Sequence, residues 1–415
     1  MRTDVDVAII GAGPYGLSLS AHLTASRVEN RVVGIPMHGW TARMPKGMLL
    51  KSEPFASSLS DPRGSFSLGA YCQERGRNYA EIGLPVPIET FIDYGTAFRE
   101  RFVPHVDTHR VVSLERDRGN YLLRLDSGEI FSARKTVVAV GLEHFAHLPM
   151  PFAGQPAEFV SHSSKHTDPV SFREQDVIVV GGGASAIDLA CLIGEAGGRV
   201  VLTTRRPELE VHAGGGALPR RLAERVRRPM TGIGPSWRSL FFTEAPHIFR
   251  LLPPAMRLNI VKSYLGPAGG WFMKDRLERA VKTICRARPL AVTTEKSRVR
   301  LAVAIDGTVR ELRGHHIIAA TGYRVDIRKI GFLSAEMCEL LDTLEHTPVL
   351  SAHFETNLPG LFFVGPASAS TFGPLARFVF GTEYAARRLA GHLRRTSRVP
   401  APAKKGYALA GEPAI

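Results

Sequence analysis

Two glycine-rich turns carry the most specific chemical signal in this sequence of 415 residues. The first, GAGPYG at 11–16, follows the apolar run 5–10, and the second, GGGASA at 181–186, follows the apolar run 177–180. In such a turn the first glycine permits a tight bend, the second lets the backbone approach a pyrophosphate, and the third small residue lets helix and strand pack closely. Two turns of this kind predict two dinucleotide sites that face each other, as hydride transfer between a nicotinamide and a flavin requires.

Both turns have the strand and helix context that the fingerprint needs, because helical runs follow at 17–25 and 187–196. The helix N-terminus then offers free N–H groups and a partial positive charge to the phosphates. A purely structural turn in one copy is the alternative. We expect the pyrophosphates to be bound by Gly11, Gly13, Pro14, Tyr15 and Gly16 in the first site, and by Gly181, Gly183, Ser185 and Ala186 in the second.

The residues after the second strand of each unit indicate which nucleotide is bound. An acidic residue there holds an adenosine ribose, whereas an arginine accommodates a 2′-phosphate. In the second unit the strand at 199–204 is followed by Arg205 and Arg206, which favours NADPH over NADH; a solvated basic loop is the alternative. In the first unit the strand at 31–35 is followed by no acidic residue. The sequence therefore leaves open how the first adenosine ribose is held.

Composition excludes several other classes of protein. Hydrophobic residues make up 44% of the chain and charged residues 22%, as in an ordinary globular enzyme. The sequence contains no apolar run of about 20 residues, the length of a membrane helix. The first strand begins too early to leave room for a signal peptide, so we expect a cytoplasmic protein. The four cysteines lie far apart, with neither C-x-x-C nor a zinc spacing, so we expect no dithiol and no metal.

The net charge of +14 raises the question whether the protein binds nucleic acid. The arginines that dominate this charge are scattered, and no aromatic side chains are interleaved with them. Amphipathic helices with solvated basic faces explain the pattern better than a nucleic-acid surface does. We therefore expect a small-molecule substrate rather than a nucleic acid as the partner.

The order of elements predicts an α/β fold with two Rossmann-like dinucleotide-binding domains, the second inserted into the first, and a helical cap insertion. We assign residues 1–155 and 316–398 to the first dinucleotide-binding domain and residues 156–315 to the second, NADPH-binding domain. The cap, at about 207–267, is rich in Gly, Pro and aromatic residues, which predicts a larger or more apolar substrate buried beneath it. Residues 399–415 form a Pro/Ala/Lys tail that we expect to be disordered.

Over nearly its whole length the chain resembles the class B flavoprotein monooxygenases, which include flavin-containing, N-hydroxylating and Baeyer–Villiger enzymes. Besides the two turns, the resemblance rests on FVSHSS at 159–164, AATGY at 319–323 and FFVG at 362–365. The segment 48–71 resembles the N-hydroxylases in particular. Two departures matter: the Baeyer–Villiger glycine between Phe159 and His162 is absent, and the lysine that grips the substrate in amino-acid N-hydroxylases falls at Pro54, which argues against ornithine or lysine as substrate.

The resemblance implies that FAD occupies the first site and NADPH the second. It further implies a monooxygenase that inserts one oxygen atom of O₂ into a small molecule through a C4a-(hydro)peroxyflavin, above all by N-hydroxylation of an amine. The polar candidates for catalysis beside the flavin are Lys51 and Ser52. The resemblance also implies that further residues bind the cofactors: Trp40 and Met48 near the isoalloxazine, His162, Thr321 and Gly322 at the domain junction, and Gly365.

Each of these roles has a structural alternative. Trp40 and Met48 could be ordinary core residues, His162 a linker histidine satisfied by protein partners, and Lys51 a solvated loop lysine. At the level of function the rivals are an NAD(P)H-dependent flavin reductase that passes electrons to an external acceptor, and a non-enzymatic flavin-binding redox sensor. Substrate identity, N- versus S- or C-oxygenation and the oligomeric state, a homo-oligomer included, stay open.

Overall fold

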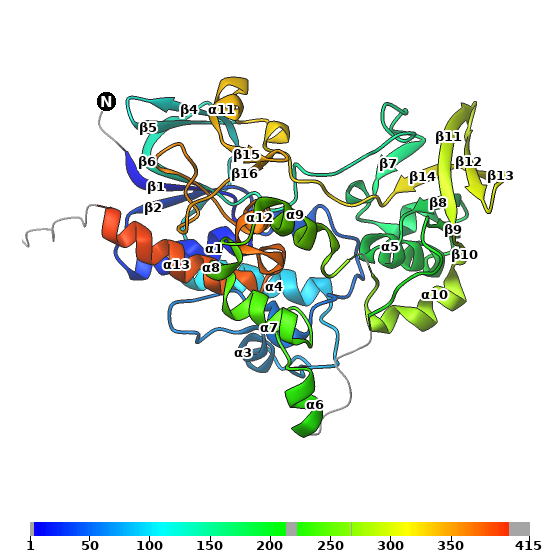
Figure 1. The fold of residues 1–415 in the computed structure, drawn as a ribbon, viewed down its shortest axis with the longest axis horizontal. Helices are drawn as coiled ribbons and strands as arrows, with labels where there is room; N and C mark the ends of the chain where they lie inside the picture. Colours follow the sequence, from blue (N-terminus) through cyan, green and yellow to red (C-terminus); the bar gives the residue numbers. More distant parts are fainter. Residues whose placement is uncertain (1–3, 213–221, 267, 398–415) are drawn as a thin grey trace, which may run out of the picture.

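The computed structural model describes residues 4–212, 222–266 and 268–397. The predicted tail at 399–415 and part of the predicted cap therefore lie outside the described residues. The described chain forms two large sheets, one mixed and one parallel, with helices packed on them, and Figure 1 shows them side by side along the longest axis of the molecule.

The first sheet has seven strands in the order β3-β2-β1-β6-β5-β4, and β17 pairs with the carboxyl-terminal half of β6. β1, β2, β3, β6 and β17 run parallel, whereas β4 and β5 extend the sheet as an antiparallel hairpin. Every residue of β1 is buried, as expected for a central strand covered on both faces. The bounds are β1 (Val5–Ile10), β2 (Asn30–Val33), β3 (Val106–Asp107), β4 (Val111–Asp117), β5 (Asn120–Leu125), β6 (Ile130–Val138) and β17 (Leu361–Phe363).

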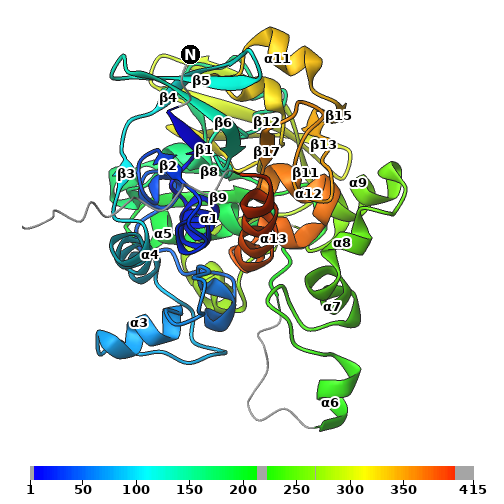
Figure 2. The same cartoon turned by 90° about the vertical axis from the view of Figure 1, so that its left-hand side faces the viewer.

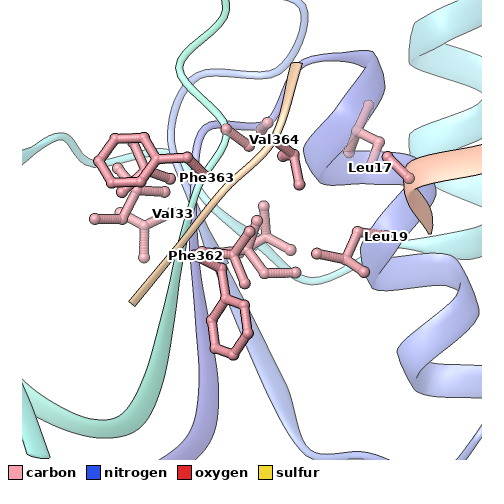
Figure 3. Packing of buried hydrophobic residues seen from close by; sticks show 14 of the residues in the cluster. Leu17, Leu19, Val33, Phe362, Phe363 and Val364 are labelled. Atoms are coloured by element: carbon pink, nitrogen blue, oxygen red, sulfur yellow. The ribbon is translucent and has the colours of Figure 1, made fainter. Parts of the chain in front are cut away.

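Helices from both ends of the chain pack beside this sheet. α1 (Pro14–Ala25) lies against α13 (Gly381–Thr396), as Figure 2 shows. α13 buries Ala385, Ala386, Leu389 and Leu393 along one stripe, the spacing that makes an amphipathic helix dock. In Figure 3, Phe362 and Phe363 of β17 lie in the core that also holds Leu17 of α1. The other elements of this unit are α2 (His38–Thr41), η1 (Pro54–Ser57), α3 (Leu68–Glu74), α4 (Ile88–Phe102), η5 (Ile327–Lys329), α11 (Ala335–Leu340), β15 (Thr343–Leu344), β16 (Thr347–Pro348), η6 (Gly365–Ser368), α12 (Ala369–Phe372) and η7 (Pro374–Arg377).

The second sheet has five parallel strands in the order β10-β9-β8-β14-β7. α5 packs on β8 and β9, and the antiparallel sheet β11-β12-β13 shares a hydrophobic cluster with β8 and β14. The bounds are β7 (Val160–His162), β8 (Asp176–Val180), β9 (Arg199–Thr203), β10 (Lys282–Ile284), β11 (Ala287–Glu295), β12 (Arg298–Ile305), β13 (Thr308–Gly314), β14 (His316–Ala319), η2 (Ser163–Lys165), η3 (Pro169–Phe172), α5 (Ala184–Glu195), η4 (Trp271–Met273) and α10 (Lys274–Ala280).

These sheets confirm the predicted α/β fold with two Rossmann-like units. Because β17 and α13 return to the first sheet after the second sheet is complete, the second unit is inserted into the first. The domain boundaries at 155 and 316 stay predictions. Residue 155 lies in the connection between β6 and β7, whereas His316 is the first residue of β14, which belongs to the second sheet.

Within its described residues, the segment predicted as the cap holds four short helices: α6 (Leu222–Arg227), α7 (Trp237–Glu244), α8 (Pro246–Phe249) and α9 (Pro254–Ser263). Although the chain enters this segment from the second unit, α8 and α9 pack on α12, and α7 packs on η7, both of the first unit. Phe242 and Phe249 form a buried cluster with Leu375 of η7. The segment thus shares a small core with the first unit.

Candidate functional site

A cavity of about 440 Å³ lies at the carboxyl ends of the strands of the first sheet. It is lined by residues 10–15 at the end of β1, residues 33–35 at the end of β2 and residues 139–144 after β6. The second unit also contributes, through Ala184, Ser185 and Asp188 of α5. Crevices of this kind, at the point where the strand order reverses, are the usual nucleotide sites of open α/β sheets.

The first glycine-rich turn has the close contacts that its sequence predicts. A Cβ on Gly11 would lie 2.5 Å from the carbonyl oxygen of Ala139, and a Cβ on Gly16 would lie 1.9 Å from that of Gly11. A Cβ on Gly13 would meet nothing within 4 Å, although Gly13 lines the cavity. Gly13 is the N-cap of α1 and no side chain caps the helix, so the first N–H groups of α1 are free for a ligand. This cradle fits a pyrophosphate.

Tyr15 links the turn to the end of the chain. Its hydroxyl lies 3.0 Å from the carbonyl oxygen of Ala376 and 2.9 Å from that of Phe378, so it donates to this pair of acceptors. Burial raises the pKa of Tyr15. Gly365, at a φ of +72°, brings the backbone against the Tyr15 ring, where a Cβ would lie 3.4 Å away. Tyr15 and Pro366 line the cavity, whereas Gly365 lies just behind it.

A carboxylate from another part of the chain lies at the end of the cavity near β2. Glu143 lines the cavity together with His38, Arg43 and Arg110. Its Oε1 lies 3.3 Å from Arg43, 3.4 Å from Arg110 and 3.6 Å from the Nε2 atom of His38. Glu143 therefore brings an acidic group to the place where the sequence showed none after the strand at 31–35. No signal adjacent to β2 could have revealed it, because Glu143 follows β6.

The residues predicted to lie beside the flavin line the cavity: Trp40, Met48, Lys51 and Ser52. The Trp40 ring packs edge-on against Phe91, with 4.6 Å between the ring centroids. Burial lowers the pKa of Lys51 to about 8; the carboxylate of Asp188 opposes this shift and the charge of Arg377 adds to it. Lys51 is thus a cavity residue, in contrast to the solvated lysine that the sequence left open.

The second turn repeats the geometry of the first. A Cβ on Gly181 would lie 2.4 Å from the carbonyl oxygen of Ala320 and 3.1 Å from the Cβ of Ala186. Gly183 is the N-cap of α5, which again has no side-chain cap, and Ser185 in its first turn lines the cavity. The N-terminus of α5 therefore offers a second set of backbone donors.

One of the two arginines after β9, Arg206, lies next to this second turn. A Cβ on Gly182 would lie 3.5 Å from the Cδ atom of Arg206, which places that side chain beside the turn. Arg206 also forms an ion pair of 3.0 Å with Glu210, and Arg205 is exposed. A basic side chain thus stands where a 2′-phosphate is expected.

At the junction of the two units, His162 is buried and bonded through both ring nitrogens. Its Nε2 lies 2.9 Å from the carbonyl oxygen of Gly322 and its Nδ1 lies 2.9 Å from the Ser164 hydroxyl. The Thr321 hydroxyl donates to the carbonyl oxygen of His147. None of His162, Thr321 and Gly322 lines the cavity, so any effect of this trio on a cofactor passes through neighbours such as Ser164, which does. Their contact with a cofactor stays a prediction.

The aromatic cap residues do not have the place predicted for them. No described residue of 207–267 lines the cavity. Phe242 and Phe249 pack on each other and on Leu375, while Trp237 is exposed. The prediction of a large apolar substrate beneath the cap therefore loses its structural basis, because these rings build the core of the cap. The described part of the cap reaches the cavity indirectly, through Arg377, whose guanidinium donates to the carbonyl oxygens of Val261 and Tyr264, and through Phe378, which packs against the cap cluster.

Sequence analysis did not single out Asp188, although Asp188 lines the cavity from α5 and is only 6% exposed. The four cysteines are free and none of them lines the cavity. Within the described residues, no cluster of three or more His, Cys, Asp or Glu side chains could hold a metal ion. None of the helices in the described part of the chain combines the length and apolarity that crossing a bilayer requires.

Comparisons with known proteins agree with a two-dinucleotide fold. Residues 5–231 match the family described as pyridine nucleotide-disulphide oxidoreductase. A ferredoxin–NADP reductase from Ignicoccus hospitalis is 25% identical over 224 residues, which are 54% of this chain and 61% of that protein. The chain spans about half the length of the curated relatives it matches.

Solved structures cover the whole chain at lower identity. An ornithine N-hydroxylase from Kutzneria sp. 744 superposes with a TM-score of 0.75 at 18% identity, covering 95% of this chain and 100% of that one. The cadaverine monooxygenase of the desferrioxamine biosynthetic pathway from Erwinia amylovora gives 0.72 at 18% identity, covering 100% and 99%. At such identities the likeness shows a shared fold.

Proposed function

We propose that this chain, which belongs to the pyridine nucleotide-disulphide oxidoreductase family, is an FAD- and NADPH-dependent monooxygenase that inserts one oxygen atom of O₂ into an amine. The observation that carries this proposal is the composition of the cavity beside the first turn. A disulphide reductase of this family needs a dithiol next to its flavin, and no cysteine lines the cavity. Lys51 and Asp188 line it instead.

Each part of the proposed chemistry has residues to support it. The pyrophosphate of FAD binds at Gly11 and Gly13 and at the N-terminus of α1, and that of NADPH binds at Gly181 and Gly183 and at the N-terminus of α5. Once reduced by NADPH, the bound flavin supplies the electrons that activate O₂. The chain's own part is to bring the two nucleotides to one cavity, since α5 lines the same space as the first turn.

The amine is the substrate class that the cavity favours, because Asp188 offers a buried acceptor to a nitrogen donor. The likeness of the fold to ornithine and cadaverine hydroxylases supports the same class. By alignment of the motifs, Pro54 stands where the amino-acid N-hydroxylases carry a substrate-gripping lysine. We therefore propose an amine without the α-amino acid group of ornithine or lysine.

The test is a panel of amines, sulfides and ketones incubated with the FAD-loaded enzyme, NADPH and ¹⁸O₂. We expect one labelled oxygen atom in an amine product and NADPH consumption that matches product formation. Ornithine and lysine should be poor substrates. Peroxide as the sole oxygen product with every compound would refute the proposal.

A second candidate, an NADPH-dependent reductase that passes electrons to a protein acceptor, is favoured by the 25% identity to a ferredoxin–NADP reductase. The two candidates differ in their need for oxygen. Under strict anaerobiosis the reductase would oxidise NADPH continuously with ferredoxin as acceptor, whereas the monooxygenase would stop after one equivalent per flavin. Continuous anaerobic turnover would therefore establish the second candidate.

A further inference from the structure

Two carboxylates line the cavity, and only one of them has a cationic partner. Glu143 is paired with Arg43 and Arg110. Asp188 lines the cavity from α5, is 6% exposed, and its Oδ1 has no hydrogen-bond partner. An unpartnered buried carboxylate oxygen is costly, so a group that arrives with an N–H donor gains the interaction that the protein itself does not make.

Lys51 lines the same cavity from the loop before η1, and its charge interacts with that of Asp188 without a direct ion pair between them. We propose that Asp188 and Lys51 form the amine-binding subsite of this cavity, in which Asp188 accepts a hydrogen bond from the substrate nitrogen and Lys51 exchanges a proton with it. This inference rests on the proposed function and names the residues that select its substrate.

The argument is one of charge balance. The ionisable groups that face the pair from the packed elements are Arg276 of α10, Cys191 of α5, Arg377 of η7 and His212 of the predicted cap segment. Of these, Arg276 is bound to Glu195 through two hydrogen bonds, and Arg377 to backbone carbonyls. Glu195 neutralises Arg276, whereas the carbonyl acceptors of Arg377 leave its charge in place. Asp188 is thus the carboxylate that faces the two cationic groups Lys51 and Arg377 in a space of low polarity.

An ammonium that enters the subsite adds a further cation beside Lys51 and Arg377, with Asp188 as the facing carboxylate. The cheapest way to restore the balance is to release a proton. Lys51 as the free amine can take the proton of the substrate, R–NH₃⁺ + Lys51–NH₂ → R–NH₂ + Lys51–NH₃⁺, which leaves the nitrogen lone pair free to react. If Lys51 is charged beforehand, it loses its proton to solvent on binding.

The acid–base properties of the pair are consistent with this exchange near neutrality. Burial raises the pKa of Asp188 to about 7, with Arg276 and Lys51 opposing the shift. Burial lowers the pKa of Lys51 to about 8. At about pH 8 Asp188 is therefore ionised and Lys51 holds its proton only part of the time, so a cationic ligand can displace it.

The experiment is calorimetric titration of the oxidised, FAD-loaded enzyme with NADP⁺ present, using hexylamine as the probe and 1-hexanol as its uncharged counterpart. No reaction occurs under these conditions, so the result does not depend on turnover. At pH 8 we expect hexylamine to bind with proton release, seen as a heat that varies with the ionisation enthalpy of the buffer. The alcohol should bind more weakly and release no proton.

Two variants assign the roles. Asp188→Asn should weaken hexylamine binding at least tenfold and leave NADP⁺ binding unchanged, because one charge-assisted hydrogen bond is lost. Lys51→Met should keep hexylamine binding but abolish the proton release. Retention of one FAD per chain shows that each variant has folded; if Asp188→Asn does not fold, the proton count in Lys51→Met decides.

The inference is overturned if Asp188→Asn leaves hexylamine binding intact, if it weakens NADP⁺ instead, or if proton release persists in Lys51→Met. Failure of the proposed function looks different. In that case the amine binds through Asp188 but no labelled oxygen enters it in the turnover assay. Conversely, labelled product with an amine affinity independent of Asp188 would keep the reaction and reject this subsite.

Discussion

Replacing Gly13 by alanine separates cofactor binding from folding in this chain. Gly13 has a φ of −86° and a ψ of −173°, a conformation that alanine adopts without strain. Its added methyl group would meet nothing within 4 Å in the protein. Because Gly13 lines the cavity and the helix N-terminus is uncapped, the methyl group can conflict only with a ligand at the start of α1.

The expected magnitudes follow from this geometry. For the protein without FAD, a glycine-to-alanine change at a compatible position stabilises by about 0.4–1 kcal/mol through the unfolded chain. Alanine is the poorer N-cap by an amount of about the same size, so the free energy of unfolding should change by less than about 1 kcal/mol. A pyrophosphate pushed away from the backbone loses at least one charge-assisted hydrogen bond of about 1.5–3 kcal/mol, which weakens FAD binding by about 10–150-fold.

The assay is titration of the apoprotein with FAD, followed by flavin fluorescence, together with urea unfolding of the same apoprotein. Gly331→Ala is the matched control, since Gly331 is exposed, its added Cβ would also meet nothing within 4 Å, and it lies outside the cavity. The control should bind FAD like the parent protein. Unchanged FAD affinity in Gly13→Ala would refute the placement of the pyrophosphate at this turn, and a large loss of apoprotein stability would refute the geometry.

Three further changes test neighbouring parts of the argument. Gly16→Ala should yield little folded protein, because its Cβ would lie 1.9 Å from the carbonyl oxygen of Gly11 and overpacking of this severity costs more than about 1–3 kcal/mol. Soluble expression and thermal unfolding measure the loss of folded protein, and a parent-like Tm would contradict the prediction. The double change Arg205→Ala, Arg206→Ala should raise the KM for NADPH at least tenfold and leave that for NADH nearly unchanged in steady-state assays; equal effects on both would show that the arginines are structural. Lys51→Met should raise the free energy of unfolding by about 1–3 kcal/mol below pH 8. In the parent protein the folded state must hold a charged amine at these pH values although burial lowers the pKa of Lys51 to about 8, and the variant avoids this cost. This gain should vanish as the pH rises towards 10.5, the ordinary pKa of lysine, and a gain independent of pH would contradict the assignment.

The local parts of the site could be predicted from the sequence. A glycine-rich turn between a strand and a helix is set by neighbouring residues, so the constraints on Gly11 and Gly16 and the free N-termini of α1 and α5 follow from a short stretch of chain. Side chains predicted by resemblance, such as Trp40 and Lys51, also reached the cavity. Their segment follows β1 and β2 closely in the sequence, so the short connection limits the positions that it can occupy.

The parts that depend on distant contacts could not be predicted. Glu143 reaches the β2 end of the cavity from the loop after β6, and nothing near β2 announces it. Asp188 stands in an apolar helical run, and the sequence alone does not tell which face of α5 meets the first unit. The rings of Phe242 and Phe249 had a partner in Leu375, more than 120 residues later (375 − 249 = 126), so their role in the core of the cap was not visible.

The return of β17 and α13 to the first sheet also orders the events of synthesis. All strands of the second sheet, from β7 to β14, leave the ribosome before β17 does. The inserted unit can therefore fold on the growing chain, while α1 waits for α13 and β6 waits for β17. Apolar side chains such as Leu17 then stay without their final partners until the last elements emerge. A nascent chain arrested before residue 361 would hold a complete second sheet and an incomplete first one. FAD would therefore bind late in the synthesis of the protein.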